Sequence, residues 1–201
     1  MGENPFNKLL ESKKQIILYG PPGTGKTFKT KQYATEFLSK YVESMIESNN
    51  SPEKQVWIFQ ANPNKFDVIG AINDKELTED VWTVSRYTKK IKKGDIGLIW
   101  ISGENAGIYA QINILSNPEM MLESEASIKH WKSLDHKNIE EMRVRYNYKY
   151  KFTDNPILRS DLLKIKELEN LEIIKQSQGT NFKVNNEEWE ILSKLIEEQI
   201  K

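Results

Sequence analysis

The spacing of hydrophobic and polar positions changes once along the chain, near residue 55. Before this point, from Phe28 to about Ile46, apolar residues recur at helical intervals and predict one amphipathic helix. After it, short β-branched and aromatic runs alternate with turns that contain Gly, Pro or Asn, which is typical of strands joined by tight loops. The polar stretch from Glu47 to Gln55 interrupts both patterns. We therefore predict an N-terminal segment over residues 1–50, a linker over 51–55 and a β-rich domain over 56–201.

Within the β-rich domain the apolar runs predict several strands and a few helices. The predicted strands cover residues 56–60, 81–87, 96–102, 108–115, 143–152 and 171–175, and the predicted helices cover 68–74, 157–168 and about 187–199. Asn185 and Glu188 have the spacing of a capping box, which marks the start of the last helix. Residues 117–141 are polar without a clear period and predict a loop with some helix. Residues 176–182 predict another loop, directly before the last helix.

The strand predicted at residues 143–152 alternates most regularly. Its apolar positions are Val144, Tyr146, Tyr148, Tyr150 and Phe152, and its cations are Arg143, Arg145, Lys149 and Lys151. Because successive side chains of a strand point to opposite faces, we expect one face in the core and the other positively charged. A second group of cations lies between Arg86 and Lys93, without an acid. Such runs are ordinarily solvated surface, but two of them in one domain favour contacts with nucleic-acid phosphates.

A glycine-rich motif precedes the N-terminal helix. The apolar run from Lys14 to Gly20 predicts a strand buried on both faces, and it leads into GPPGTGKT, a full match to the pattern GxxxxGK[ST]. In such a loop, backbone N–H groups surround phosphate oxygens, Lys26 reaches the β and γ phosphates, and the Thr27 hydroxyl binds Mg²⁺. The predicted nucleotide contacts are Gly20, Pro21, Pro22, Gly23, Thr24, Gly25, Lys26 and Thr27. A plain turn between strand and helix is the alternative, and the order strand, motif, helix favours the phosphate loop.

An acidic partner for this motif is missing. A hydrolysing P-loop NTPase also needs acidic residues after an apolar strand to hold Mg²⁺ and polarise water, and no run of four apolar residues here ends in an acid pair. We therefore expect no NTP hydrolysis by this chain alone, and residues 1–50 are typical of the opening of a larger ATPase fold. GPPGTGKT resembles the AAA+ family, and its pairing with the following domain is similar to McrB-like restriction ATPases. That resemblance implies ATP or GTP with Mg²⁺ as cofactor, and the remainder of an AAA+ ATPase or a restriction nuclease subunit as partner.

Short landmarks of the β-rich domain occur in a specific order. They are WIFQANP from Trp57, WTVSRY from Trp82, KKGD before IWISG, AGIYA, and QGTNF followed by a helix with an acidic-Trp start. Together they resemble the EVE family, of the PUA-like superfold shared with YTH domains. The resemblance implies an α+β fold, a mixed β-barrel with surrounding helices. It also implies binding of modified nucleobases, often modified cytosine in DNA, by flipping the base into an aromatic pocket.

Candidate nucleic-acid contacts follow from these residues and from the resemblance. The pocket candidates are Asn62, Trp82, Arg86, Trp100, Ser102, Gly103, Gln178, Gly179 and Thr180, and the phosphate candidates are Lys89, Lys90, Arg143 and Arg145. For Trp82 and Trp100 the alternative is an ordinary core tryptophan, and we place Trp57 in the core. For the Asn, Ser and Gly positions the alternative is a turn. We predict no catalytic residue, because no Ser/His/Asp set or carboxylate pair stands out.

Composition narrows these hypotheses. The chain has 29 Lys and Arg against 29 Asp and Glu, so affinity for a polyanion must come from local patches. It has no cysteine, which excludes disulfides and thiolate metal sites. No apolar run approaches the roughly 20 residues that span a bilayer, and the polar start lacks a signal-peptide core, so we expect a cytoplasmic protein.

Three functions remain open. The first is a reader of modified bases in DNA, associated with a McrB-like restriction or defence ATPase. The second is an NTP-binding component in which Gly20–Thr27 is the functional centre and the β-rich domain regulates it. The third is a reader of RNA modifications, because PUA-like folds also serve RNA.

Overall fold

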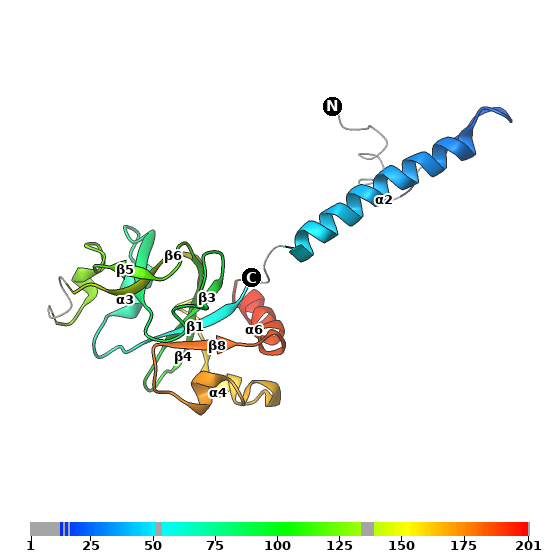
Figure 1. Ribbon diagram of the computed structural model, residues 1–201. Helices are drawn as coiled ribbons and strands as arrows, with labels where there is room; N and C mark the ends of the chain where they lie inside the picture. The colour runs from blue at the N-terminus through cyan, green and yellow to red at the C-terminus, as the bar shows by residue number, and fades with distance from the viewer. Residues whose placement is uncertain (1–12, 14, 16, 51–53, 134–138, 201) are drawn as a thin grey trace. The chain divides into compact units, whose positions relative to one another are not determined.

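The computed structural model describes residue 13, residue 15 and residues 17–50, 54–133 and 139–200 (Figure 1). The chain forms two compact units, Met1–Glu53 and Lys54–Lys201. The described part of the first unit is mainly one helix, whereas the second unit is built on a sheet.

The helix of the first unit is α2 (Lys26–Asn50). It confirms the predicted helix and extends beyond the expected limits at both ends. The buried strand predicted from Lys14 to Gly20 is wrong for residues 17–20, which have no regular structure, and Ile17 is 85% exposed. Lys14 and Ile16 lie outside the described residues. A strand needs a neighbour to pair with, and the described part of this unit offers none.

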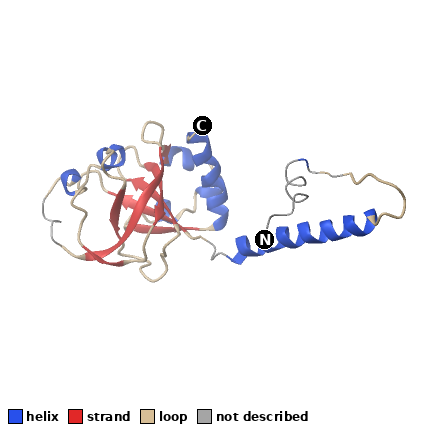
Figure 2. Cartoon of the chain, turned by 90° about the horizontal axis from the view of Figure 1, so that it is seen from above, coloured by secondary structure: helices blue, strands red, loops and turns tan. Residues whose placement is uncertain are grey.

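The second unit is built on one mixed sheet that curls around its core (Figure 2). Its strands are β1 (Val56–Ala61), β2 (Glu79–Thr83), β3 (Ile96–Ile101), β4 (Gly107–Ile114), β5 (Glu119–Met121), β6 (Glu141–Lys151), β7 (Ile157–Leu158) and β8 (Asn181–Val184). The main path runs β2-β6-β4-β3-β1-β8, with β5 paired to β6 and β7 paired to β4. Strands β1 and β3 are parallel, and the other paired strands are antiparallel.

Short helices connect the strands, and a longer helix ends the chain. They are α3 (Val68–Asn73), the 3₁₀ turn η1 (Ile128–His130), α4 (Arg159–Leu162), the 3₁₀ turn η2 (Lys166–Leu168), α5 (Glu172–Lys175) and α6 (Asn186–Gln199). The predicted capping box starts α6: Asn185 accepts from the Glu188 backbone N–H, and the Glu188 carboxylate accepts from the backbone N–H of Asn185. Leu192 and Ile196 of α6 are buried against the sheet.

The sheet has a hydrophobic core on each face, as strand β1 illustrates. Val56 and Ile58 belong to the core that α5 and α6 cover, whereas Trp57 and Phe59 belong to the core on the other face, where α3 packs. Trp57 is fully buried, as predicted, and its indole N–H donates to the Asp95 carboxylate at 2.8 Å. Both faces of the central strands are therefore dry, which fits their continuous apolar sequences.

The two ends of the strand path are joined by a side chain. Asn181, at the start of β8, is fully buried, and its amide oxygen accepts from the backbone N–H of Ser85 at 3.0 Å. Its amide nitrogen donates to the backbone carbonyl of Thr83, at the end of β2, at 3.5 Å. No ladder connects β2 to β8 among the described residues, so these bonds link the two strands instead.

Several parts of the predicted secondary structure need correction. The single helix predicted over residues 157–168 is divided into β7, α4 and η2, because Ile157 and Leu158 pair with β4 instead of entering a helix. Residues 171–175 form α5 with its N-cap Leu171 and not a strand: Ile173 is buried, while Glu172 turns toward Arg86. Residues 181–184 form β8 where a loop was expected, and residues 119–121 add β5 to a segment predicted as loop and helix. Strand β2 also ends at Thr83, short of the predicted residue 87.

Candidate nucleic-acid interface

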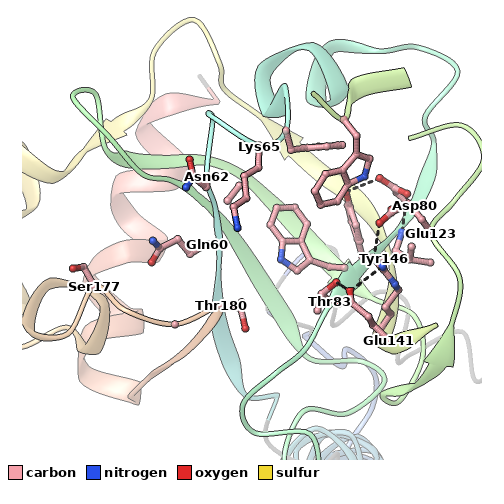
Figure 3. Close-up of a pocket in the computed structure, with 17 residues that line it drawn as sticks. Gln60, Asn62, Lys65, Asp80, Thr83, Glu123, Glu141, Tyr146, Ser177 and Thr180 are labelled. Atoms are coloured by element: carbon pink, nitrogen blue, oxygen red, sulfur yellow. Dashed lines mark hydrogen bonds and ion pairs between the residues drawn. The ribbon is translucent and has the colours of Figure 1, made fainter. Parts of the chain in front are cut away.

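The second unit contains a cavity of about 420 Å³ at the open side of the curled sheet, between β1, β2 and β6 (Figure 3). Its lining residues are Gln60, Ala61, Asn62, Lys65, Phe66, Asp80, Val81, Trp82, Thr83, Glu123, Trp131, Glu141, Arg143, Tyr146, Ser177, Gly179 and Thr180. We call it the aromatic cavity. Its size lies in the range of pockets that bind small ligands, about 300–1,000 Å³.

Aromatic rings form much of its wall and hold one another in place. The Trp82 ring meets Tyr146 edge to face at 5.9 Å between centroids and Phe59 at 6.1 Å. The Phe66 ring meets Trp131 at 5.1 Å, and the two backbones form an isolated β-bridge. Such ring pairs add about 0.5–1.5 kcal/mol each beyond the area they bury. The wall is therefore rigid and ready to receive a flat apolar group.

A buried ion cluster forms one side of the cavity. Arg143 is 2% exposed and donates to Glu123 at 2.6 Å and to Glu141 at 3.0 Å. The Thr83 hydroxyl donates to the same Glu141 oxygen at 2.9 Å. This corrects the predicted basic face at its first member: Arg143 is enclosed by two acids and cannot meet phosphates, whereas Arg145, Lys149 and Lys151 of β6 are exposed.

Asp80 is a second buried acid in the wall, and it forms no ion pair with any of the described residues. It is 5% exposed, and its carboxylate accepts from the backbone N–H of Val81 at 2.8 Å and from the Tyr146 hydroxyl at 3.3 Å. Burial raises the pKa of Asp80 to about 6, and the negative charge of Glu123 adds to the rise. Burial likewise raises the pKa of Tyr146 well above its usual value, so its hydroxyl stays protonated. Figure 3 shows Asp80, Glu123 and Tyr146 together, opposite Gln60 and Thr180.

Three of the predicted pocket residues form the opposite rim. Asn62 lines the cavity and also makes the turn that was its alternative role, since its side chain accepts from the Asn64 backbone N–H at 2.9 Å. Gly179 has φ +152°, and an added Cβ would lie 3.2 Å from the Phe182 ring. The Thr180 hydroxyl bonds to the Ser85 hydroxyl and to Asn181. The loop before β8 therefore supplies part of the rim.

Trp100, Ser102 and Gly103 line a different cavity, which corrects the expectation of one pocket shared with Trp82. Trp100 is 3% exposed and belongs to the core on the other face of the sheet. The second cavity has a volume of about 380 Å³ and is also lined by Gln60, Ala106, Arg159, Ile173, Ile174 and Ser177. Gln60 and Ser177 line both cavities, so the two adjoin.

The remaining candidates lie outside both cavities. Arg86 is half-buried, donates to Glu172 at 2.7 Å and lies over the Phe182 ring at 5.8 Å, so its charge is paired. Gln178 is exposed, beside residues that line the cavities. Lys89 and Lys90 are exposed, as is Arg145, so these three keep the accessibility that phosphate contacts require.

The sequence did not single out Phe66, Asp80, Trp131 or Tyr146 as site residues. Trp131 lies in the segment without a period, and it reaches the site through the bridge to Phe66. Asp80 precedes the Trp82 landmark by two residues, and period 2 in a strand places both on one face. This two-residue spacing from Trp82 was the one feature of the sequence that could have identified Asp80 as a site residue.

The glycine-rich motif of the first unit forms a curled loop directly before α2. Gly23 and Gly25 have φ of +80° and +73°, which side chains rarely adopt. The Lys26 ammonium donates to the carbonyl of Gly20 at 2.7 Å, to that of Pro21, and to the Thr24 hydroxyl at 3.2 Å. Residues of the loop are exposed, apart from the half-buried Lys26.

Metal clusters and membrane-spanning helices are both absent from the described residues. No three His, Asp or Glu side chains gather there closely enough to hold a metal ion. No helix in the same residues combines the length and apolar character that crossing a bilayer requires.

Comparisons with known proteins identify the family of the second unit. Residues 55–195 match the model of the EVE domain. Comparison with curated proteins finds no match.

The fold is similar to that of a hypothetical protein from Leishmania major (15% identity, 74% of this chain and 98% of that chain covered, TM-score 0.55). It is also similar to human THYN1, solved in complex with DNA containing 5-methylcytosine (13% identity, 71% and 97% covered, TM-score 0.52), and to a Rhodopseudomonas palustris protein (15%, 70% and 92%, TM-score 0.51). The curled mixed sheet with helices is the EVE/PUA-like fold, and the chain belongs to the EVE domain family.

Proposed function

We propose that the second unit reads a modified base in DNA by taking the extruded base into the aromatic cavity. The observation that carries this proposal is the lining of that cavity: four aromatic rings beside a buried acid that no described cation pairs with, in a space of about 420 Å³. The structure of THYN1 with DNA containing 5-methylcytosine supports it through the shared fold.

The free energy gained by stacking an extruded base is similar in size to the free energy that extrusion costs. Extruding a base costs a few kcal/mol, and stacking on an aromatic ring returns about 1–3 kcal/mol per base. A methyl mark adds only about 0.8 kcal/mol through apolar contact. Discrimination of the mark therefore depends on how closely the rigid wall of Trp82, Phe66 and Trp131 fits it.

Asp80 favours a base that carries an amine. A carboxylate accepts hydrogen bonds, and the N4 amine of cytosine is a donor that carboxylates recognise. A thymine or uracil would place a carbonyl oxygen against the carboxylate, so that this buried acceptor of the base would find no donor there, which costs about 1–3 kcal/mol. We therefore favour modified cytosine over modified thymine as the ligand.

Fluorescence polarisation with a labelled duplex that contains one 5-methylcytosine tests the proposal. We expect tighter binding than to the unmodified duplex, a loss of about tenfold or more in Trp82→Ala, and near-normal binding in Trp82→Phe, which keeps a ring for stacking. Trp189→Phe on α6 is the control variant away from the cavity. Equal, salt-sensitive binding to modified and plain duplexes would contradict base reading. Preference for the same mark in RNA would favour the alternative RNA reader.

A second candidate function, NTP binding by the first unit, is favoured by the loop at Gly20–Thr27. Its left-handed glycines and the inward-turned Lys26 suit a phosphate, for which Lys26 would supply the charge and Thr27 the hydroxyl for Mg²⁺. Binding of a fluorescent ATP or GTP analogue to the intact chain, lost in Lys26→Ala and kept in Lys29→Ala, is the expected result. No binding by the unmutated chain would remove this function, and with it the proposed association with a McrB-like ATPase or a restriction nuclease.

A further inference from the structure

The second cavity is the feature that base reading in the aromatic cavity does not explain. It contains Trp100, Ser102 and Gly103, which the sequence had marked as nucleic-acid contacts, and it adjoins the aromatic cavity through Gln60 and Ser177. We propose that the second cavity binds the nucleotide next to the extruded one on the same strand. This inference rests on the proposed function.

The position of the second cavity suits a neighbouring nucleotide. Adjacent nucleotides of one strand are joined by a single phosphate, so their binding sites must lie next to each other. Here the two cavities share a wall formed by Gln60 at the end of β1 and Ser177 in the loop after α5. In Figure 3 the Gln60 side chain points toward Ser177, on the side of the aromatic cavity opposite Asp80.

The lining of the second cavity offers the three kinds of contact that a nucleotide needs. Ile173, Ile174 and Ala106 give apolar surface for a base. The Ser102 hydroxyl donates to the Ala61 carbonyl at 3.0 Å, which leaves its oxygen free to accept from a base edge. Arg159 is exposed and adds a cation for a phosphate.

An unsatisfied polar atom in the shared wall points to a ligand. The side-chain oxygen of Gln60 is buried and has no hydrogen-bond partner among the described residues. A buried acceptor without a partner is unfavourable, and in native proteins a bound group or a water molecule satisfies it. A base amine in either cavity would satisfy it.

The position of Arg159 is fixed by the backbone. Its N–H donates to the Ala106 carbonyl at 2.7 Å, and β7 before it pairs with β4. Across the cavity, Gly103 has φ +112° in the turn that follows β3. Both sides of the cavity are therefore held by the sheet, so a nucleotide would meet a preformed site.

The test measures binding of the intact chain to a duplex with one 5-methylcytosine, by fluorescence polarisation. The nucleotide on its 5′ side, or that on its 3′ side, is replaced by an abasic analogue. We expect about a tenfold loss on one side only, because one base contact is removed. In Arg159→Glu the intact duplex should bind more weakly and the same abasic replacement should cost less than about threefold, because the neighbouring nucleotide is no longer held. Lys166→Glu, an exposed cation after α4 that lines neither cavity, is the matched control.

The outcomes separate this inference from the proposed function. If the intact chain prefers the methylated duplex but neither abasic replacement weakens binding, the second cavity is not a nucleotide site and base reading stands. If Arg159→Glu and Lys166→Glu weaken binding of every duplex equally, Arg159 contributes only to the long-range electrostatic attraction between the protein and DNA. That result would overturn the inference. If the intact chain does not distinguish the methylated duplex at all, the proposed function fails, and this inference fails with it.

Discussion

At the scale of single residues, Asp80 and Arg143 show two ways of placing a charge in the wall of the aromatic cavity. Arg143 is buried with two carboxylates, at 2.6 and 3.0 Å, that bind its guanidinium. Asp80 is almost as buried, but its neighbours are uncharged donors, among them the Val81 backbone N–H and the Tyr146 hydroxyl, and the like charge of Glu123. The ionised form of Asp80 is therefore unfavourable in the folded chain.

The raised pKa of Asp80 makes stability depend on pH. Its carboxyl has a pKa of about 6 in the folded chain and an ordinary value of 3.8. Below pH 3.8 it is protonated in both states. As the pH rises from there toward the folded-state pKa, the unfolded state ionises first, so stability is lost and stays lost above that pKa, by at most ~3 kcal/mol.

Asp80→Asn should remove this loss. We expect the variant to be more stable than the unmutated chain at about pH 7.5 and to approach it at about pH 4, as measured by urea denaturation at both pH values. Asp154→Asn, an exposed acid in the turn after β6, is the control and should show no such dependence. A variant that is less stable at the higher pH would show that the hydrogen bonds of Asp80 outweigh the cost of burying its charge.

Single residues also mark a limit of prediction from sequence. We expected Trp82 in the pocket because it belongs to the WTVSRY landmark, and Trp82 lines the aromatic cavity. Trp131 could not be found in this way, since its place depends on a bridge between distant segments. Arg143 was expected on an exposed basic face, but alternation along a strand cannot tell an exposed cation from one enclosed by acids.

At the scale of elements, the central strands and the last helix were predicted well, whereas residues 157–184 were not. The limits of β1, β3, β4 and α6 agree with the predicted ones to within two residues at each end. The run LEIIK was predicted as a strand but forms α5, because so short an apolar run suits a strand and one turn of helix equally. Strand β8 was missed because its four residues follow a loop without a break.

Strand β8 also shows how the sheet is closed. Asn181 bonds to the end of β2 and the segment after it with both ends of its amide, and its neighbours Gly179 and Thr180 line the aromatic cavity. Closure of the sheet and the shape of the cavity therefore depend on one buried side chain.

Asn181→Ala should weaken this closure. We expect the free energy of unfolding to fall by ~1–3 kcal/mol, since the backbone N–H of Ser85 loses its closest acceptor. Urea denaturation measures the loss, and Asn170→Ala, an exposed loop position, is the control. Affinity for the methylated duplex should fall too, at a temperature where the variant is folded. Unchanged stability would mean that the hydroxyl of Thr180, which lies 3.4 Å from the same N–H, can replace Asn181.

At the scale of the whole molecule, the two parts of the chain differ in how well the sequence predicted them. The β-rich part has alternating strands and ordered landmarks, and both agree with the family match over residues 55–195. The sequence of the N-terminal part contained two signals, the glycine-rich motif and the helical spacing of apolar residues after it. The helix is present, but the strand that should precede the motif is not formed at residues 17–20, because a strand's stability comes from neighbours that lie elsewhere in a fold.

Every residue that lines the two cavities belongs to the second unit, and so do the hydrophobic cores on both faces of the sheet. Residues 54–201 made alone should therefore unfold in one cooperative transition and bind the methylated duplex with an affinity within about threefold of the intact chain. Calorimetry and fluorescence polarisation at matched salt test this, with the Trp82→Ala form of the fragment as control. A fragment that folds but binds more than about tenfold more weakly would assign part of the DNA contact to the first unit.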